Sequence, residues 1–130
     1  MNLLRFSAAL TLGLTLLAQE KTRVIAFGAH PDDCDLGSSG MAALLARAGH
    51  AVKFVSLTNG DAGHQTLGGG ALARRRYAET QEVARRLGIT YDVLNNHDGE
   101  LMPTLDVRLQ VIRKIREWNE IGRASCRERV

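Results

Sequence analysis

The stretch Thr22–Thr58, TRVIAFGAHPDDCDLGSSGMAALLARAGHAVKFVSLT, contains the pattern that decides the fold. Its two ends, Thr22–Ala29 and Ala51–Thr58, are short apolar runs, which are typical of buried strands. Between them, the Ser38–Ser39 pair offers N-caps for an apolar helix that a glycine ends. This order predicts two parallel strands joined by a helical crossover.

The same alternation continues toward the C-terminus. A helix is predicted over Ala71–Leu87, a strand over residues 89–94 and a further helix over Leu105–Trp118. The expected inward-facing side chains are Ala73, Tyr77, Val83, Ala84 and Leu87 on the first helix. On the second they are Leu105, Leu109, Ile112 and Ile115, with Trp118 as a further candidate. The order predicts one α/β domain, a Rossmann-like three-layer fold with a mostly parallel sheet, which we expect to be incomplete at its C-terminus.

Three polar loops follow the predicted strands, over residues 30–37, 59–70 and 95–103. Ligands of open parallel sheets bind at the carboxyl ends of the strands. We therefore expect these loops to form the site. A dinucleotide site is a poor fit, because no Gly-x-Gly-x-x-Gly turn follows the first strand.

Charge and cysteine content exclude two broad classes of protein. The formal charge is +3, but without residues 1–18 and 120–130 there are 13 basic and 12 acidic side chains, so we expect no nucleic-acid partner. Two cysteines are too few for the disulfide framework of a small secreted domain.

Residues 1–18 have the layout of a signal peptide, with Arg5 followed by an apolar run that ends near Ala18. We expect export to the periplasm or the extracellular space. The run is short for a bilayer span, so no stable membrane anchor is expected. The first alternative is a buried N-terminal helix of the mature fold, and a retained anchor that faces lipid is a weaker third option. Cytoplasmic localisation is less expected than export.

Residues 120–130, EIGRASCRERV, lose the helical periodicity of the preceding segment and read like the translation of a sequencing adapter. We expect this tail to be non-native, and the natural protein to continue beyond Asn119. The domain proper is then residues 19–119, the N-terminal part of a longer domain.

The loop after the first strand gathers His30, Asp32, Asp33 and Asp35 within six residues. Imidazole and carboxylate together suit zinc, which in catalytic sites takes three protein ligands and a water. A neighbouring carboxylate could serve as general base. The alternative is a helix N-terminus that acidic residues stabilise, which fits Asp35 best.

The motifs AHPDD, DLGSSG, TNGDAGH, RRRYAETQEVARRLGI and HDGELMP resemble the PIG-L, or LmbE-like, family of zinc-dependent N-deacetylases. The resemblance covers essentially all of residues 22–119. It implies that His30 and Asp33 bind zinc and that Asp32 is the base. Cys34 stands where the family often has Glu. The family's third ligand is a histidine from a later motif that nothing here matches, so we expect the chain as written to be inactive.

The other loops are expected to handle the substrate. Asp61 and Asp98 could hydrogen-bond sugar hydroxyls, or could simply form turns. Arg76 is expected to contact the substrate, within an Arg-x-x-Glu pattern that matches the family. His64 and His97 are expected near the site, but not as the third ligand.

The resemblance implies a metal-dependent hydrolase that removes an acyl group, expected to be acetyl, from an N-acylated amino sugar or related amide. Two alternatives remain at this point. Asp33 and Asp35 could bind magnesium in a phosphotransferase or phosphatase, or the protein could be a non-catalytic relative that binds glycans. The sequence does not determine the oligomeric state.

Overall fold

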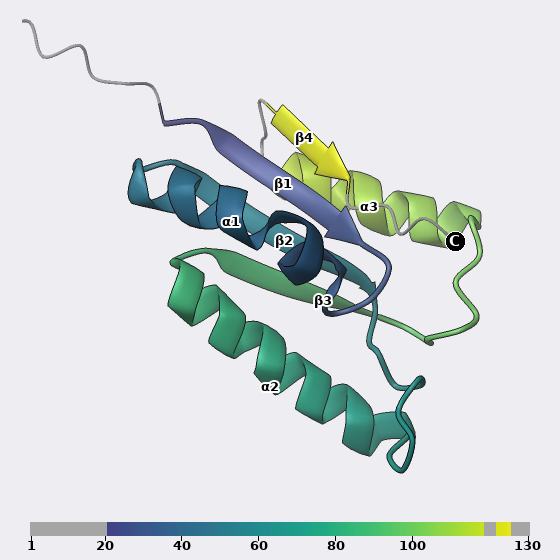
Figure 1. The fold of residues 1–130 in the computed structure, drawn as a ribbon. Helices are drawn as coiled ribbons and strands as arrows, with labels where there is room; N and C mark the ends of the chain where they lie inside the picture. Colours follow the sequence, from purple (N-terminus) through teal and green to yellow (C-terminus); the bar gives the residue numbers. More distant parts are fainter. Residues whose placement is uncertain (1–20, 119–121, 126–130) are drawn as a thin grey trace, which may run out of the picture.

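A parallel sheet of four strands forms the centre of the fold (Figure 1). The computed structural model describes residues 21–118 and 122–125. The strand order is β3-β2-β1-β4, and every neighbouring pair is parallel. The strands are β1 (Arg23–Gly28), β2 (Ala51–Thr58), β3 (Thr90–Asn96) and β4 (Gly122–Ser125). The predicted signal peptide lies outside the described residues.

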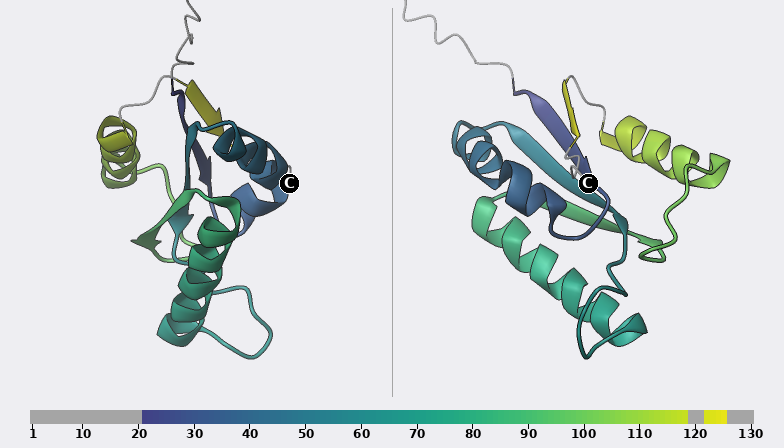
Figure 2. Two further views of the ribbon diagram at one scale, coloured as in Figure 1. Left: turned by 90° about the vertical axis from the view of Figure 1, so that its left-hand side faces the viewer. Right: turned by 45° about the vertical axis from the view of Figure 1, so that its right-hand side comes forward.

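Three helices cover the two faces of this sheet. Helices α1 (Asp33–Arg47) and α2 (Gly69–Leu87) lie on one face, and α3 (Leu105–Trp118) lies on the other (Figure 2). The prediction of an α/β, Rossmann-like fold with a parallel sheet and three layers is therefore confirmed. None of the helices that the structure describes is long and apolar enough to cross a membrane.

Both faces of the sheet are packed because side chains alternate along each strand. In β2, Phe54 packs with Tyr91 and Ala42 on the face that α1 and α2 cover. Its neighbour Val55 packs with Ile25 and Trp118 on the face of α3. The uninterrupted apolar pattern of the strands reflects this burial on both sides.

The start of α1 differs from the prediction. The helix begins at Asp33, with Asp32 at the N-cap, and not after Ser38 and Ser39. Asp33 and Asp35 lie in the first turn, where negative charge is favourable at the positive end of the helix dipole. The predicted metal ligand Asp33 therefore lies on a helix.

Four of the predicted inward-facing side chains are exposed, whereas Val83, Ala84 and Leu87 on α2 and Trp118 on α3 pack inward as predicted. Tyr77 is 53% exposed, and Leu72 and Thr80 are buried on α2 instead. On α3, Trp118 is buried, whereas Leu105, Leu109 and Ile112 are exposed. The last turn of α3 is the part that packs on the sheet, where the Trp118 Nε1–H donates to the Val24 carbonyl at 3.1 Å.

Strand β4 comes from the tail that we expect to be non-native. It pairs in parallel with β1 through backbone groups, which any sequence carries. The chain runs outward from β1 to β2 and β3 and then returns to the other side of β1. The strand order therefore reverses beside β1, and in such sheets ligands bind at the carboxyl end of the strands at this point.

Candidate metal and substrate site

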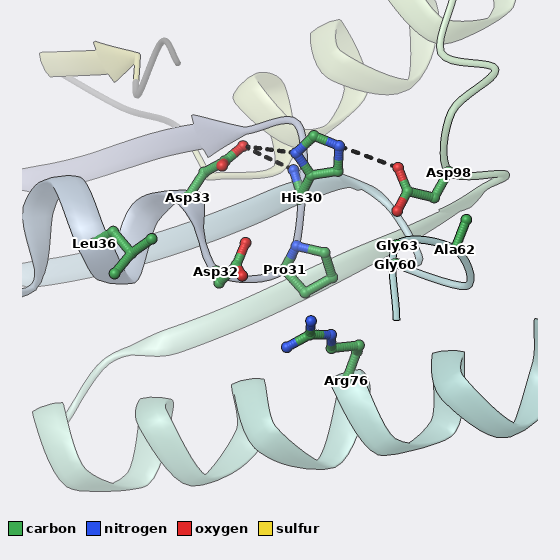
Figure 3. Close-up of a pocket in the computed structure, with 10 residues that line it drawn as sticks. All are labelled: His30, Pro31, Asp32, Asp33, Leu36, Gly60, Ala62, Gly63, Arg76 and Asp98. Carbon is green, nitrogen blue, oxygen red and sulfur yellow. Dashed lines mark hydrogen bonds and ion pairs between the residues drawn. The ribbon is translucent and has the colours of Figure 1, made fainter. Parts of the chain in front are cut away.

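A pocket of about 290 Å³ lies where β1 ends (Figure 3). It brings together five of the six side chains predicted from the sequence. They come from the loops after β1 and β3, from the first turn of α1 and from α2. They are His30, Asp32, Asp33, Arg76 and Asp98, and the remaining lining residues are Pro31, Leu36, Gly60, Ala62 and Gly63. Asp61, the sixth, is not in the lining that the structure describes.

The backbone that leads into His30 is fixed by β2. The Ala29 carbonyl accepts hydrogen bonds from the Thr58 backbone N–H at 2.9 Å and from Thr58 Oγ1 at 2.7 Å. Ser56 Oγ donates to the Thr58 carbonyl at 2.7 Å. Both side chains are buried, which orients the turn rigidly. Sequence reasoning missed them, although hydroxyl residues in an otherwise apolar strand were the available signal.

The next residue, Pro31, is held by β3. The Tyr91 hydroxyl donates to the Pro31 carbonyl at 2.8 Å, and the Tyr91 ring packs edge-on against Phe54 with a centroid distance of 5.6 Å. Burial, followed by the charge of Asp35, raises the pKa of Tyr91, so its hydroxyl stays protonated as a donor. Tyr91 thus links the edge strand to the candidate catalytic loop.

We predict that Tyr91→Phe lowers the free energy of unfolding by about 1–3 kcal/mol, because the ring packing survives but a buried acceptor on Pro31 is left without its donor. Urea unfolding of the full-length protein measures this change. Tyr77→Phe is the matched control, because that ring is 53% exposed, and should leave the stability unchanged. Equal stability of the two variants would contradict the role given to Tyr91.

Two glycines make room for the loop. A Cβ atom added to Gly28 would lie 2.6 Å from Asp33 Cβ, closer than real carbon atoms approach. A Cβ on Gly60 would lie 2.8 Å from Pro31 Cγ, and its φ of +65° favours glycine in any case. The close approach of Asp33 to β1 and of Pro31 to the loop after β2 therefore depends on these residues.

The His30 ring lies between two carboxylates (Figure 3). Its Nδ1 is 3.5 Å from Asp33 Oδ2, and its Nε2 is 3.1 Å from Asp98 Oδ1. The His30 backbone N–H also donates to Asp33 Oδ2 at 2.9 Å. Both carboxylates are largely buried, whereas the His30 side chain is 39% exposed toward the pocket.

Asp32 and Asp35 differ in their access to the pocket. Asp32 lines it, and although it is the N-cap residue its side chain makes no capping hydrogen bond to the first turn of α1, which the structure describes in full. Asp35 does not line the described pocket, and its Oδ1 is buried with no hydrogen-bond partner among the described residues. Burial, followed by the charge of Asp32, raises the pKa of Asp35 to about 6.

Arg76 reaches the pocket from α2, across from the loop after β1 (Figure 3). Its Nη1 is 3.2 Å from Glu79 Oε2, and Glu79 also pairs with Arg75 at 2.9 Å. The Arg-x-x-Glu pattern therefore gives one pocket residue and one carboxylate that pairs along the helix.

Asp61 joins two loops instead of entering the pocket. Its Oδ1 accepts the Asp98 backbone N–H at 2.9 Å, and its Oδ2 lies 2.5 Å from His97 Nδ1. The hydrogen bond from Asp98 is the main cause that lowers the pKa of Asp61, while Asp61 in turn raises the pKa of His97. Both shifts in pKa favour the charged forms of this pair.

Two other histidines, His64 and His50, accept backbone hydrogen bonds outside the pocket lining. His64 Nδ1 accepts backbone N–H groups of Thr66 and Leu67 within its own loop. His50 accepts the Thr22 backbone N–H at 3.2 Å, at the opposite end of the sheet from the pocket.

The donor chemistry fits zinc in kind, because an imidazole and a carboxylate meet at His30 and Asp33. The set of ligands is incomplete, because catalytic zinc takes three protein ligands and these are two. Within residues 21–118 and 122–125, no group of three or more His, Cys, Asp or Glu side chains is arranged to hold a metal ion. Buried Cys34 packs in the core cluster below α1, so it is not the third ligand in this arrangement.

A family model and a relative that match this chain are both named as deacetylases. Residues 25–121 match the family model of PIG-L, GlcNAc-PI de-N-acetylase. The chain is 34% identical over 98 residues to diacetylchitobiose deacetylase of Thermococcus kodakarensis, covering 73% of this chain and 37% of that protein. The chain thus spans little more than a third of this relative.

Solved structures resemble the fold closely. N,N'-diacetylchitobiose deacetylase from Pyrococcus horikoshii, in complex with an inhibitor, matches with a TM-score of 0.72 and 32% identity, over 80% of this chain and 40% of that one. GalB of Pseudomonas putida KT2440, a 4-carboxy-2-hydroxymuconate hydratase, matches with a TM-score of 0.71 but 19% identity, over 78% and 45% of the two chains. The second likeness concerns the fold alone, so activity must be argued from the site.

Proposed function

Because this chain belongs to the PIG-L, GlcNAc-PI de-N-acetylase, family, we propose that its parent protein is a zinc-dependent hydrolase that removes the acetyl group from an N-acetylated amino sugar. The observation that carries the proposal is the meeting of His30, Asp33 and Asp32 in one pocket. The relatives at 32% and 34% identity are deacetylases by name, and their named substrates are sugars with N-acetyl groups.

His30 and Asp33 would hold the metal. Because catalytic zinc takes three protein ligands, the proposal requires one more from a part of the parent protein outside the described residues. When bound, the metal would supply Lewis acidity, which polarises the amide carbonyl and makes water more acidic. The chain as written is then expected to bind zinc weakly and to be inactive.

Asp32 is the general base of this proposal. It takes a proton from water while the water oxygen forms a bond to the amide carbon, and it returns the proton to nitrogen as the C–N bond breaks. The products are acetate and the free amino sugar. Its position next to Asp33, on the pocket wall and without a capping bond, supports this role.

Arg76 and Asp98 supply polar groups for the sugar. A guanidinium donates hydrogen bonds and a carboxylate accepts them, which together suit hydroxyl groups. Both side chains line the pocket on the sides that face the loop after β1 (Figure 3).

Metal removal tests the proposal. We expect the full-length parent protein to release acetate from N,N'-diacetylchitobiose, to lose this activity after treatment with a chelator, and to regain it with Zn²⁺ but not with Mg²⁺. Release of acetate and of the free amine is measured together with bound metal. Activity that depends on Mg²⁺ would favour the phosphotransferase alternative, and sugar binding without turnover would favour the glycan-binding one.

A further inference from the structure

The His30 ring can donate to one of its two carboxylate neighbours when it is neutral. A neutral imidazole has one N–H, and the other nitrogen carries a lone pair. The contact from Nε2 to Asp98 Oδ1 is 3.1 Å, whereas the contact from Nδ1 to Asp33 Oδ2 is 3.5 Å. Of these two ion-pair contacts, the shorter one favours the tautomer with its N–H on Nε2, the nitrogen that faces Asp98.

This tautomer leaves the lone pair of Nδ1 on the side of Asp33 (Figure 3). A histidine that ligates a metal does so with its unprotonated nitrogen, and it commonly donates its other N–H to a carboxylate that fixes the ring. His30 and Asp98 have the arrangement of such a pair, with Asp33 on the ligand side.

Asp98 is itself held in place. Its backbone N–H donates to Asp61 Oδ1 at 2.9 Å, and the Asp61 backbone N–H donates to Asn59 Oδ1 at 3.1 Å. The other oxygen of Asp61 pairs with His97. Since the carboxylate of Asp61 is 12% exposed and occupied on both oxygens, it connects the loops after β2 and β3.

We propose that Asp98 is a positioning residue for His30, which fixes its tautomer and ring orientation for the metal, and that Asp61 holds Asp98. The inference rests on the proposed function of the site. It gives Asp98 a role before any substrate arrives, and it replaces the sugar contact expected of Asp61 by a contact within the protein.

The first test needs no metal and no substrate. In the metal-free full-length protein labelled with ¹⁵N-histidine, long-range ¹H–¹⁵N spectra should show His30 protonated on Nε2. In Asp98→Ala the His30 signals should move toward a mixture of the two tautomers. If His30 is protonated on Nδ1, or if Asp98→Ala leaves its tautomer unchanged, the proposal is overturned.

The second test measures the Kd of Zn²⁺ by competition with a chromophoric chelator. Removing such a carboxylate partner costs about 10–100-fold in metal affinity, so Asp98→Ala should bind Zn²⁺ weaker by that factor. Asp98→Asn keeps an acceptor oxygen and should recover part of the loss. Asp61→Ala should also weaken Zn²⁺ binding, whereas Glu100→Gln, an exposed change in the same loop, should not.

If Asp98 only binds substrate, the Zn²⁺ affinity of the variant will differ from this expectation. Asp98→Ala would then raise KM and keep a Zn²⁺ affinity within about twofold of the original, far from the loss expected for an orienting partner. Should Asp98→Ala fail to fold, Asp61→Ala carries the test, and unchanged Zn²⁺ affinity in that variant counts against the proposal. If the unmodified protein binds no Zn²⁺, the proposed function fails, while the tautomer measurement still decides whether Asp98 orients His30.

Discussion

Asp32→Asn in the full-length parent protein is expected to lower kcat by about 10²–10⁴-fold, the contribution of a positioned general base, and to leave zinc bound. Asparagine has the shape of aspartate but cannot take a proton from water. Asp32 lines the pocket beside Asp33 and is not needed to cap α1, so the change should leave the fold intact. Turnover and metal content are measured on the same preparation.

Asp106→Asn is the matched control, because it is the same change at an exposed position in the first turn of α3. It should keep both activity and metal. If Asp32→Asn retains its turnover, Asp32 is not the base. If it loses zinc along with activity, Asp32 is a ligand and the assignment of Asp33 must be revised.

Gly28→Ala is expected to damage stability and metal binding together. The added methyl group would lie 2.6 Å from Asp33 Cβ and 3.4 Å from the Cys34 backbone nitrogen. Neither atom is the far end of a flexible side chain, so the start of α1 has to move. Overpacking of this kind costs about 1–3 kcal/mol of unfolding free energy. The displaced Asp33 should also weaken Zn²⁺ binding.

Gly40→Ala separates this clash from the general effect of replacing a glycine. Gly40 lies inside α1, and a Cβ there would meet no atom within 4 Å. Alanine should therefore stabilise the protein by about 0.5–1 kcal/mol. Opposite signs for the two changes in urea unfolding, with weaker Zn²⁺ binding in Gly28→Ala alone, are the expected pattern. A Gly28→Ala protein that binds Zn²⁺ normally would show that Asp33 is not the ligand.

The spacing of apolar residues, together with the glycine and capping residues between them, predicted most of the architecture. The strands Ala51–Thr58 and Arg23–Gly28 and the helix Leu105–Trp118 agree with the sequence prediction to within a residue at each end. The start of α1 was missed because a serine pair and an aspartate are comparable N-caps by local chemistry. Because α1 begins at Asp33, the first residue of the helix packs against Gly28 of β1.

The sequence by itself determined the α/β order and the presence of His30, Asp32 and Asp33 at the end of a strand. These features are local, because they depend on side-chain periodicity and on neighbours along the chain. Only the tertiary structure decided three contacts between loops. The Asp98 carboxylate lies beside the His30 ring, and the Asp61 carboxylate accepts the Asp98 backbone N–H. The Tyr91 hydroxyl donates to the Pro31 carbonyl. Loop conformations depend on contacts between residues far apart in the chain, which no local pattern specifies.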